Sequence, residues 1–146
     1  MVDAAWKTFM QLAIKQSQKG RTPFGCVIVQ NGEVLAQAFN TVASTHDPTA
    51  HGEVNAIRQA CQQNQSQYLP ETVLFTTGEP CPMCMSAILY AKISRVVYGA
   101  SISTIAQFMP QISISSEEIV THSSQEIDIT GQYMNEECLK LLQAFS

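Results

Sequence analysis

Two short runs of the sequence hold the residue types that could do chemistry. Residues 51–53 read His-Gly-Glu, and residues 80–84 read Pro-Cys-Pro-Met-Cys. Imidazole and thiolate groups are the ligands that zinc prefers, and a structural zinc site has four of them, whereas a catalytic site has three and an open position. His51, Cys81 and Cys84 therefore predict a metal with an open position, and the Glu53 carboxylate lies close to it in sequence.

The spacing of Cys81 and Cys84 places both thiols on one face of a helix start. Backbone N–H groups and the helix dipole stabilise thiolates there, and the thiolate is the form that binds metal. A Cys-Pro-x-Cys run also suits thiol–disulfide exchange, so the pair alone leaves metal binding and redox chemistry open. His51 favours metal binding, because it lies near a second predicted helix start and two such starts can meet at the carboxyl edge of an α/β sheet.

Glu53 follows His51 by two residues, a spacing that points side chains apart inside a helix. The two can serve one metal site only if His51 lies at or near the first turn. The alternative role of Glu53 is that of a first-turn glutamate stabilised by the helix dipole.

The elements that must position these residues alternate between strands and helices. Apolar spacing predicts a helix over residues 3–19 with Asp3 as its cap, and Asn31-Gly32 predicts a hairpin turn. Asp47-Pro48 predicts the start of a helix that runs to about residue 62. The remaining predicted elements are strands at 73–76, 95–99 and 126–130, helices that begin at Cys81-Pro82 and Asn135, and a loop with a short helix over 101–116. Strand–helix–strand succession predicts parallel neighbours, and the sum is a mixed sheet of about five strands with helices on both faces.

Composition limits the possible partners. The 146 residues, 45% of them hydrophobic, predict a single domain over residues 1–146. No membrane span is expected, and the odd number of cysteines, five, favours a reducing compartment, so we expect a cytoplasmic protein. The formal charge is −4, and after residue 95 the only Lys or Arg is Lys140. Nucleic-acid binding depends on Lys and Arg, so a small-molecule substrate is favoured over a nucleic acid.

Together the motifs resemble those of the cytidine-deaminase-like superfamily, most of all its purine branch of guanine deaminases and tRNA wobble-adenosine deaminases. The resemblance is carried by residues 23–25, Asn40, residues 47–53 and residues 78–84. It implies an α/β fold, a three-layer α/β/α sandwich around a five-stranded mixed sheet, and a homodimer. It also implies Zn²⁺ bound by His51, Cys81 and Cys84.

The resemblance implies roles for further residues. Zinc lowers the pKa of its bound water to about 7, and Glu53 would take the water proton, deliver it to a ring nitrogen and help protonate departing ammonia. Asn40 matches a position that hydrogen-bonds the base or its sugar, although a strand-ending turn residue is the alternative. Phe24 is expected to wall the pocket, and Gly52 and Pro80 complete the predicted substrate-binding residues, with Pro80 also setting the helix start that aims the thiolates.

We therefore expect a zinc-dependent deaminase of a free nucleobase or related small heterocycle, guanine first, which would give xanthine and ammonia. A tRNA wobble adenosine-to-inosine deaminase and a cytosine deaminase are the alternatives, the latter because Gly52 replaces the commoner alanine. Residues 101–108 lack both the acid that guanine deaminases usually carry there and the basic, glycine-containing segment of the tRNA enzymes. Alternatives of another class are a non-enzymatic zinc module, a Cys-Pro-x-Cys redox protein and an inactive deaminase fold that binds a partner.

Overall fold

A five-stranded mixed sheet forms the centre of the structure, which is a computed structural model and describes residues 3–146. The strands are β1 (Gly25–Gln30), β2 (Glu33–Phe39), β3 (Thr72–Gly78), β4 (Arg95–Ala100) and β5 (Asp128–Thr130). Their spatial order is β2-β1-β3-β4-β5, with β1 antiparallel to β2 and β3, and with β3, β4 and β5 parallel. The predicted mixed sheet is confirmed. The strands on either side of the helix after β2 are not neighbours, however, because β1 lies between them.

The β1–β2 hairpin turns at Asn31 and Gly32, as predicted. Their φ angles are 53° and 75°, and the two-residue turn that matches strand twist needs positive φ at both positions. Successive side chains of β1 point to opposite faces, so Cys26 and Ile28 enter one core cluster and Val27 the other. The nearly continuous apolar run of β1 is thus explained by a strand that is covered on both faces.

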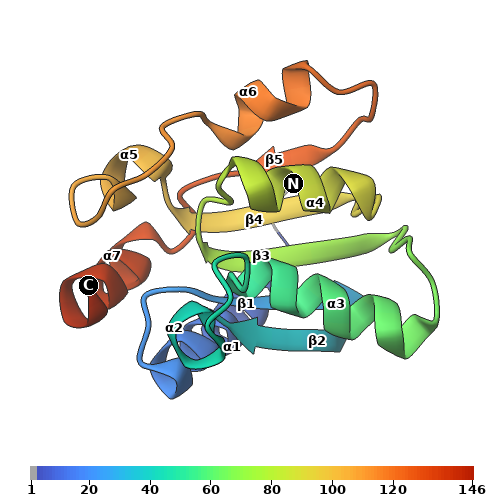
Figure 1. Cartoon of the computed structure of the whole chain (residues 1–146). Coiled ribbons are helices and arrows are strands. Elements are labelled where there is room, and N and C mark those ends of the chain that lie inside the picture. Colours follow the sequence, from blue (N-terminus) through green and yellow to red (C-terminus); the bar gives the residue numbers. More distant parts are fainter. Residues whose placement is uncertain (1–2) are drawn as a thin grey trace.

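Helices cover both faces of the sheet, which confirms the three-layer α/β/α sandwich (Figure 1). The helices are α1 (Trp6–Gly20), α2 (Val42–Thr45), α3 (Gly52–Asn64), α4 (Pro82–Tyr90), α5 (Ile102–Ile105), α6 (Ser116–Thr121) and α7 (Asn135–Phe145). Packing places α1 and α7 on one face and α3 and α4 on the other, with α6 against α4. None of the helices in residues 3–146 is long and apolar enough to cross a membrane.

Small residues set how closely two of these helices approach the sheet. The buried residues of α3 include Gly52, Ala56 and Ala60, four apart on one face, and this small-residue stripe packs against β1 and β2. On the other face α7 contacts β4 at Gly99, where an added Cβ would lie 2.2 Å from the Sγ atom of Cys138. A side chain at position 99 would therefore collide with α7, so glycine is required there.

Two predicted helix starts are wrong for one shared physical reason. Short polar side chains can bond to nearby backbone groups outside a helix, and the sequence does not show which arrangement wins. Asp3 accepts a hydrogen bond from the N–H of Ala5 (2.8 Å), and α1 begins only at Trp6. Asp47 accepts bonds from the N–H and hydroxyl of Thr49 (2.8 and 2.7 Å) in a turn before α3. The last helix, α7, begins at Asn135 as predicted, although Asn135 is its first helical residue rather than a cap and no side chain caps the helix.

Candidate active site

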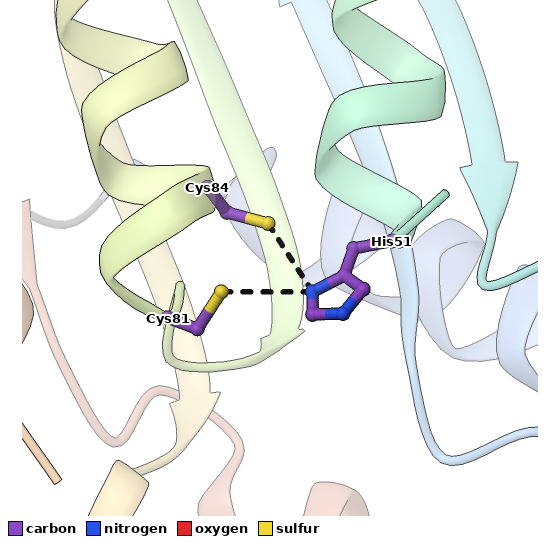
Figure 2. Close-up of side chains that lie close together, drawn as sticks. All are labelled: His51, Cys81 and Cys84. Carbon is purple, nitrogen blue, oxygen red and sulfur yellow. Dashed lines mark hydrogen bonds between the residues drawn. The ribbon is translucent and has the colours of Figure 1, made fainter. Parts of the chain in front are cut away.

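Two helix starts bring His51, Cys81 and Cys84 together. His51 is the N-cap of α3 and Cys81 the N-cap of α4, and Pro82 occupies the first turn of α4, where its missing N–H costs no hydrogen bond. The starts of α3 and α4 lie side by side at the edge of the sheet where β3 ends (Figure 1). Figure 2 shows the imidazole and both thiols pointing toward one another from these two helix starts. The predicted meeting of helix starts is confirmed.

The spacing of the three ligand atoms fits zinc. The Nδ1 atom of His51 lies 3.6 Å from the Sγ atom of Cys81 and 3.5 Å from that of Cys84. All three atoms lie within 4.8 Å of one another. With Zn–N about 2.05 Å and Zn–S about 2.3 Å, a tetrahedral ion separates its nitrogen and sulfur ligands by about 3.6 Å. The three residues thus supply a donor set and a geometry suited to zinc, with the fourth tetrahedral position left open.

The two thiols are electrostatically unequal. A hydrogen bond from the Cys84 thiol, supported by His51, lowers the pKa of Cys81 to about 4. The same bond and burial raise the pKa of Cys84 well above its ordinary value. The pair therefore holds one thiolate in advance, and metal binding displaces the proton that Cys84 keeps.

Glu53 is a buried carboxyl group beside the ligands. It lies in the first turn of α3, is 6% exposed and lines the same cavity as His51 and Cys81. Burial raises the pKa of Glu53 to about 7. His51 precedes the first helical residue, which is the condition under which the two side chains can serve one site. A carboxyl group that titrates near neutrality can both accept and release a proton.

A cavity of about 640 Å³ opens onto these residues. Its volume is in the range of small-molecule sites. Phe24 and Asn40 line one part of it, and Ile105, Met109 and Gln111 from the segment after β4 line another. Among residues 3–146, no Lys or Arg lines it. The site therefore offers a mostly apolar enclosure without a Lys or Arg side chain to neutralise a phosphate.

Two of the four predicted substrate-binding residues line this cavity and two do not. Phe24 and Asn40 do; the Oδ1 atom of Asn40 accepts the N–H of Val42 (2.9 Å), which leaves the Nδ2 amide for a ligand. Gly52 lies instead beside Cys26, where an added Cβ would be 3.6 Å from Sγ, an ordinary contact. Alanine would therefore fit at this position, so glycine here does not by itself favour a cytosine deaminase. Pro80 is buried outside the lining.

Sequence reasoning missed the cavity wall that follows β4. Its residues are Ile105, Met109, Pro110, Gln111 and Ile112. It also gave no role to Glu79, which lines the cavity and accepts hydrogen bonds from Ile102 and Ser116, on either side of that wall. The position of Glu79 directly before the second motif was a usable signal, but nothing in the sequence indicates its partners.

A sandwich of this topology with a histidine and two cysteines at its sheet edge defines a zinc-type deaminase. Comparison with known families agrees: residues 4–100 match the family described as the cytidine and deoxycytidylate deaminase zinc-binding region. The chain belongs to this family, whose members hydrolyse amino groups, and its cofactor is zinc.

Relatives of two kinds are similar to the chain. A tRNA-specific adenosine deaminase from Buchnera aphidicola subsp. Baizongia pistaciae (strain Bp) is 34% identical over 143 residues, 95% of this chain and 86% of the relative. A guanine deaminase from Bacillus subtilis (strain 168) is 41% identical over 99 residues, 64% of each chain.

Solved structures show the same two kinds of relative. A structure from studies of A-to-I editing by tRNA:A34 deaminases has a TM-score of 0.82 and 29% identity, covering 92% of this chain and 99% of its own. The X-ray structure of guanine deaminase from Bacillus subtilis has a TM-score of 0.68 and 33% identity, covering 86% and 79%. The similarity in fold spans both substrate classes.

Proposed function

We propose that this protein is a zinc-dependent aminohydrolase of a free nucleobase or related small heterocycle, with guanine as the first candidate. The observation that carries the substrate class is the cavity of about 640 Å³, whose lining has no Lys or Arg. Nucleotides and polynucleotides bring phosphates that such side chains normally neutralise. The acidic composition, eight Lys and Arg against twelve Asp and Glu, points the same way.

Guanine comes first because the guanine deaminase of Bacillus subtilis is 41% identical over the matched region. Deamination of a tRNA adenosine is the second candidate. It is favoured by the similarity of the tRNA-specific adenosine deaminase from Buchnera, which extends over 95% of this chain.

The reaction replaces an amino group on a ring carbon by a carbonyl oxygen from water, with release of ammonia. His51, Cys81 and Cys84 would hold the zinc, which when bound in a three-ligand site lowers the pKa of a water to about 7. Glu53 accepts the proton that the water loses, passes it to a ring nitrogen and then assists the departing amino group. A pKa of about 7, raised by burial, suits Glu53 to both directions of transfer.

Two lining residues position the base. Asn40 offers its Nδ2 amide as a hydrogen-bond donor, since its Oδ1 is engaged by Val42. Phe24 supplies an aromatic surface in the cavity against which a planar ring can pack. Both contacts suit a flat, uncharged heterocycle.

The test is a substrate panel. Zinc-loaded protein would be incubated with guanine, cytosine, adenine, their nucleosides and triazine analogues, and ammonia release would be measured. We expect release from a free base, guanine foremost. A parallel arm measures inosine formation in tRNA and the salt dependence of tRNA binding. Inosine formation without release from any free base would reject the proposal in favour of the second candidate.

A further inference from the structure

Glu79 is a buried carboxylate to which the deamination chemistry gives no role. It lies two residues before Cys81, is 7% exposed and forms part of the cavity lining. Its Oε1 atom accepts the backbone N–H of Ile102 (2.9 Å). Its Oε2 atom accepts both the backbone N–H (2.8 Å) and the hydroxyl (2.7 Å) of Ser116. Both oxygens are therefore engaged by protein donors, in charge-assisted bonds that are stronger than neutral ones.

The partners of Glu79 mark the two ends of one segment. Ile102 is the first residue of α5 and Ser116 the first residue of α6. Both ends of residues 102–116 are therefore hydrogen-bonded to the same carboxyl group. Figure 1 shows the connection between α5 and α6 as a loop beyond the end of β4. A compact loop of this length whose ends meet is an Ω-loop, a type that often carries function. This one supplies the cavity wall from Ile105 to Ile112.

Hydrogen bonding gives the loop little other support. Within the described residues, the hydrogen bonds of residues 103–115 all join them to residues 101–119. Ile105 and Phe108 pack into the core beside α1 and α7, whereas Ile112 and Ile114 are 66% and 37% exposed. Apolar packing thus holds the first part of the loop, while its return to the sheet edge is held by the bonds between Ser116 and Glu79 and by the packing of α6 against α4.

Glu79 is itself fixed to the framework on its other side. Its N–H donates to the carbonyl of Ala100 at the end of β4 (2.7 Å). Burial, together with the nearby Glu79 carboxylate, raises the pKa of Tyr98 on the same strand to about 12. Through its backbone N–H and its carboxylate, Glu79 therefore joins three parts of the site: the end of β4, the loop after it and the segment that carries the cysteine ligands.

We propose that Glu79 is a positioning residue: by binding both ends of residues 102–116 it fixes the cavity wall relative to Cys81 and Cys84, and so determines which base the cavity accepts. It does not carry protons, because both of its oxygens are engaged; proton transfer stays with Glu53. The kinetic consequences rest on the proposed deaminase function. The structural consequence, a tethered loop, does not.

The test is Glu79→Gln, whose amide offers one acceptor oxygen in place of two. We expect KM for the preferred base to rise about tenfold, equivalent to about 1.4 kcal/mol of binding, with kcat changed by less than about threefold. Discrimination against other bases should fall, while about one zinc per chain is retained. By hydrogen exchange, the N–H group of at least one of Ile102 and Ser116 should lose protection, because they bond to different oxygens of Glu79. Ser116→Ala, which removes one donor and keeps the charge, should raise KM in the same direction but less.

Glu71→Gln is the matched control, because Glu71 is exposed and lies outside the cavity lining. It should leave KM, kcat and exchange unchanged. A large loss of kcat at unchanged KM in Glu79→Gln would assign Glu79 to proton transfer and overturn the proposal. So would unchanged protection at Ile102 and Ser116. If wild-type protein deaminates no base, the proposed function fails, but hydrogen exchange still decides whether Glu79 tethers the loop. If Glu79→Gln does not fold, the exchange and KM of Ser116→Ala decide.

Discussion

Replacing Glu53 with glutamine should abolish turnover and leave the metal site in place. Glutamine has nearly the same volume, so the first turn of α3 and the cavity keep their shape, but an amide cannot shuttle a proton. One positioned acid–base group contributes about 10²–10⁴-fold to a rate. Because Glu53 is proposed to act at several steps, we expect the upper end, a loss in kcat of about 10⁴-fold or about 5 kcal/mol of barrier.

The same Glu53→Gln replacement that removes activity should leave the stability of the zinc-free protein unchanged or raise it. Burial raises the pKa of Glu53 from its ordinary 4.5 to about 7, so the folded state holds the proton more tightly than the unfolded state. The resulting destabilisation develops as pH rises from about 4.5 to about 7 and is complete above that. Glutamine has no charge to bury. Above pH 7, zinc-free Glu53→Gln should therefore unfold at the same or a higher denaturant concentration than the zinc-free wild type.

The assay combines ammonia release, zinc content and denaturant unfolding, with Glu71→Gln as the exposed control. Wild-type kcat in Glu53→Gln would remove this residue from proton transfer. Loss of zinc, or unfolding at lower denaturant, would show instead that Glu53 holds the site together.

Two further predictions concern the metal and the fold. Cys84→Ser should reduce zinc from about one per chain to a trace and remove activity, because a neutral hydroxyl replaces a thiolate ligand. The control Cys61→Ser, which lies outside the site, should keep both its zinc and its activity. A Cys84→Ser variant that still binds about one zinc per chain would contradict the proposed ligands. Gly99→Ala should lower the free energy of unfolding by about 1–3 kcal/mol, since the new methyl overlaps Cys138 of α7; an unchanged denaturation midpoint would show that α7 can move away from β4.

The metal ligands and much of the fold could be predicted because their signals are local. Asn31-Gly32 specifies a turn by backbone conformation alone, and the spacing of Cys81 and Cys84 specifies a shared helix face. The helix starts were harder to predict, because Asp47 bonds to Thr49 in a turn rather than capping α3. Such local competition is decided by tertiary packing.

The cavity wall could not be predicted for a different reason. Residues 101–116 have no helical or strand period, and Ile102 and Ser116 are bonded to Glu79, which is 23 and 37 residues away from them in sequence. Long-range bonds of a buried carboxylate leave no local pattern. The cavity wall that we propose to select the substrate is therefore the part of the site that the sequence describes least.

Hydrolytic deamination of a small free base is tested most directly by following the oxygen atom. Zinc-loaded protein would be given guanine in water enriched in heavy oxygen, and the product analysed by mass spectrometry. We expect xanthine that carries one oxygen atom from the solvent, together with an equal amount of ammonia. Absence of labelled product from guanine and from every other free base in the panel, with zinc bound, would contradict the proposed function.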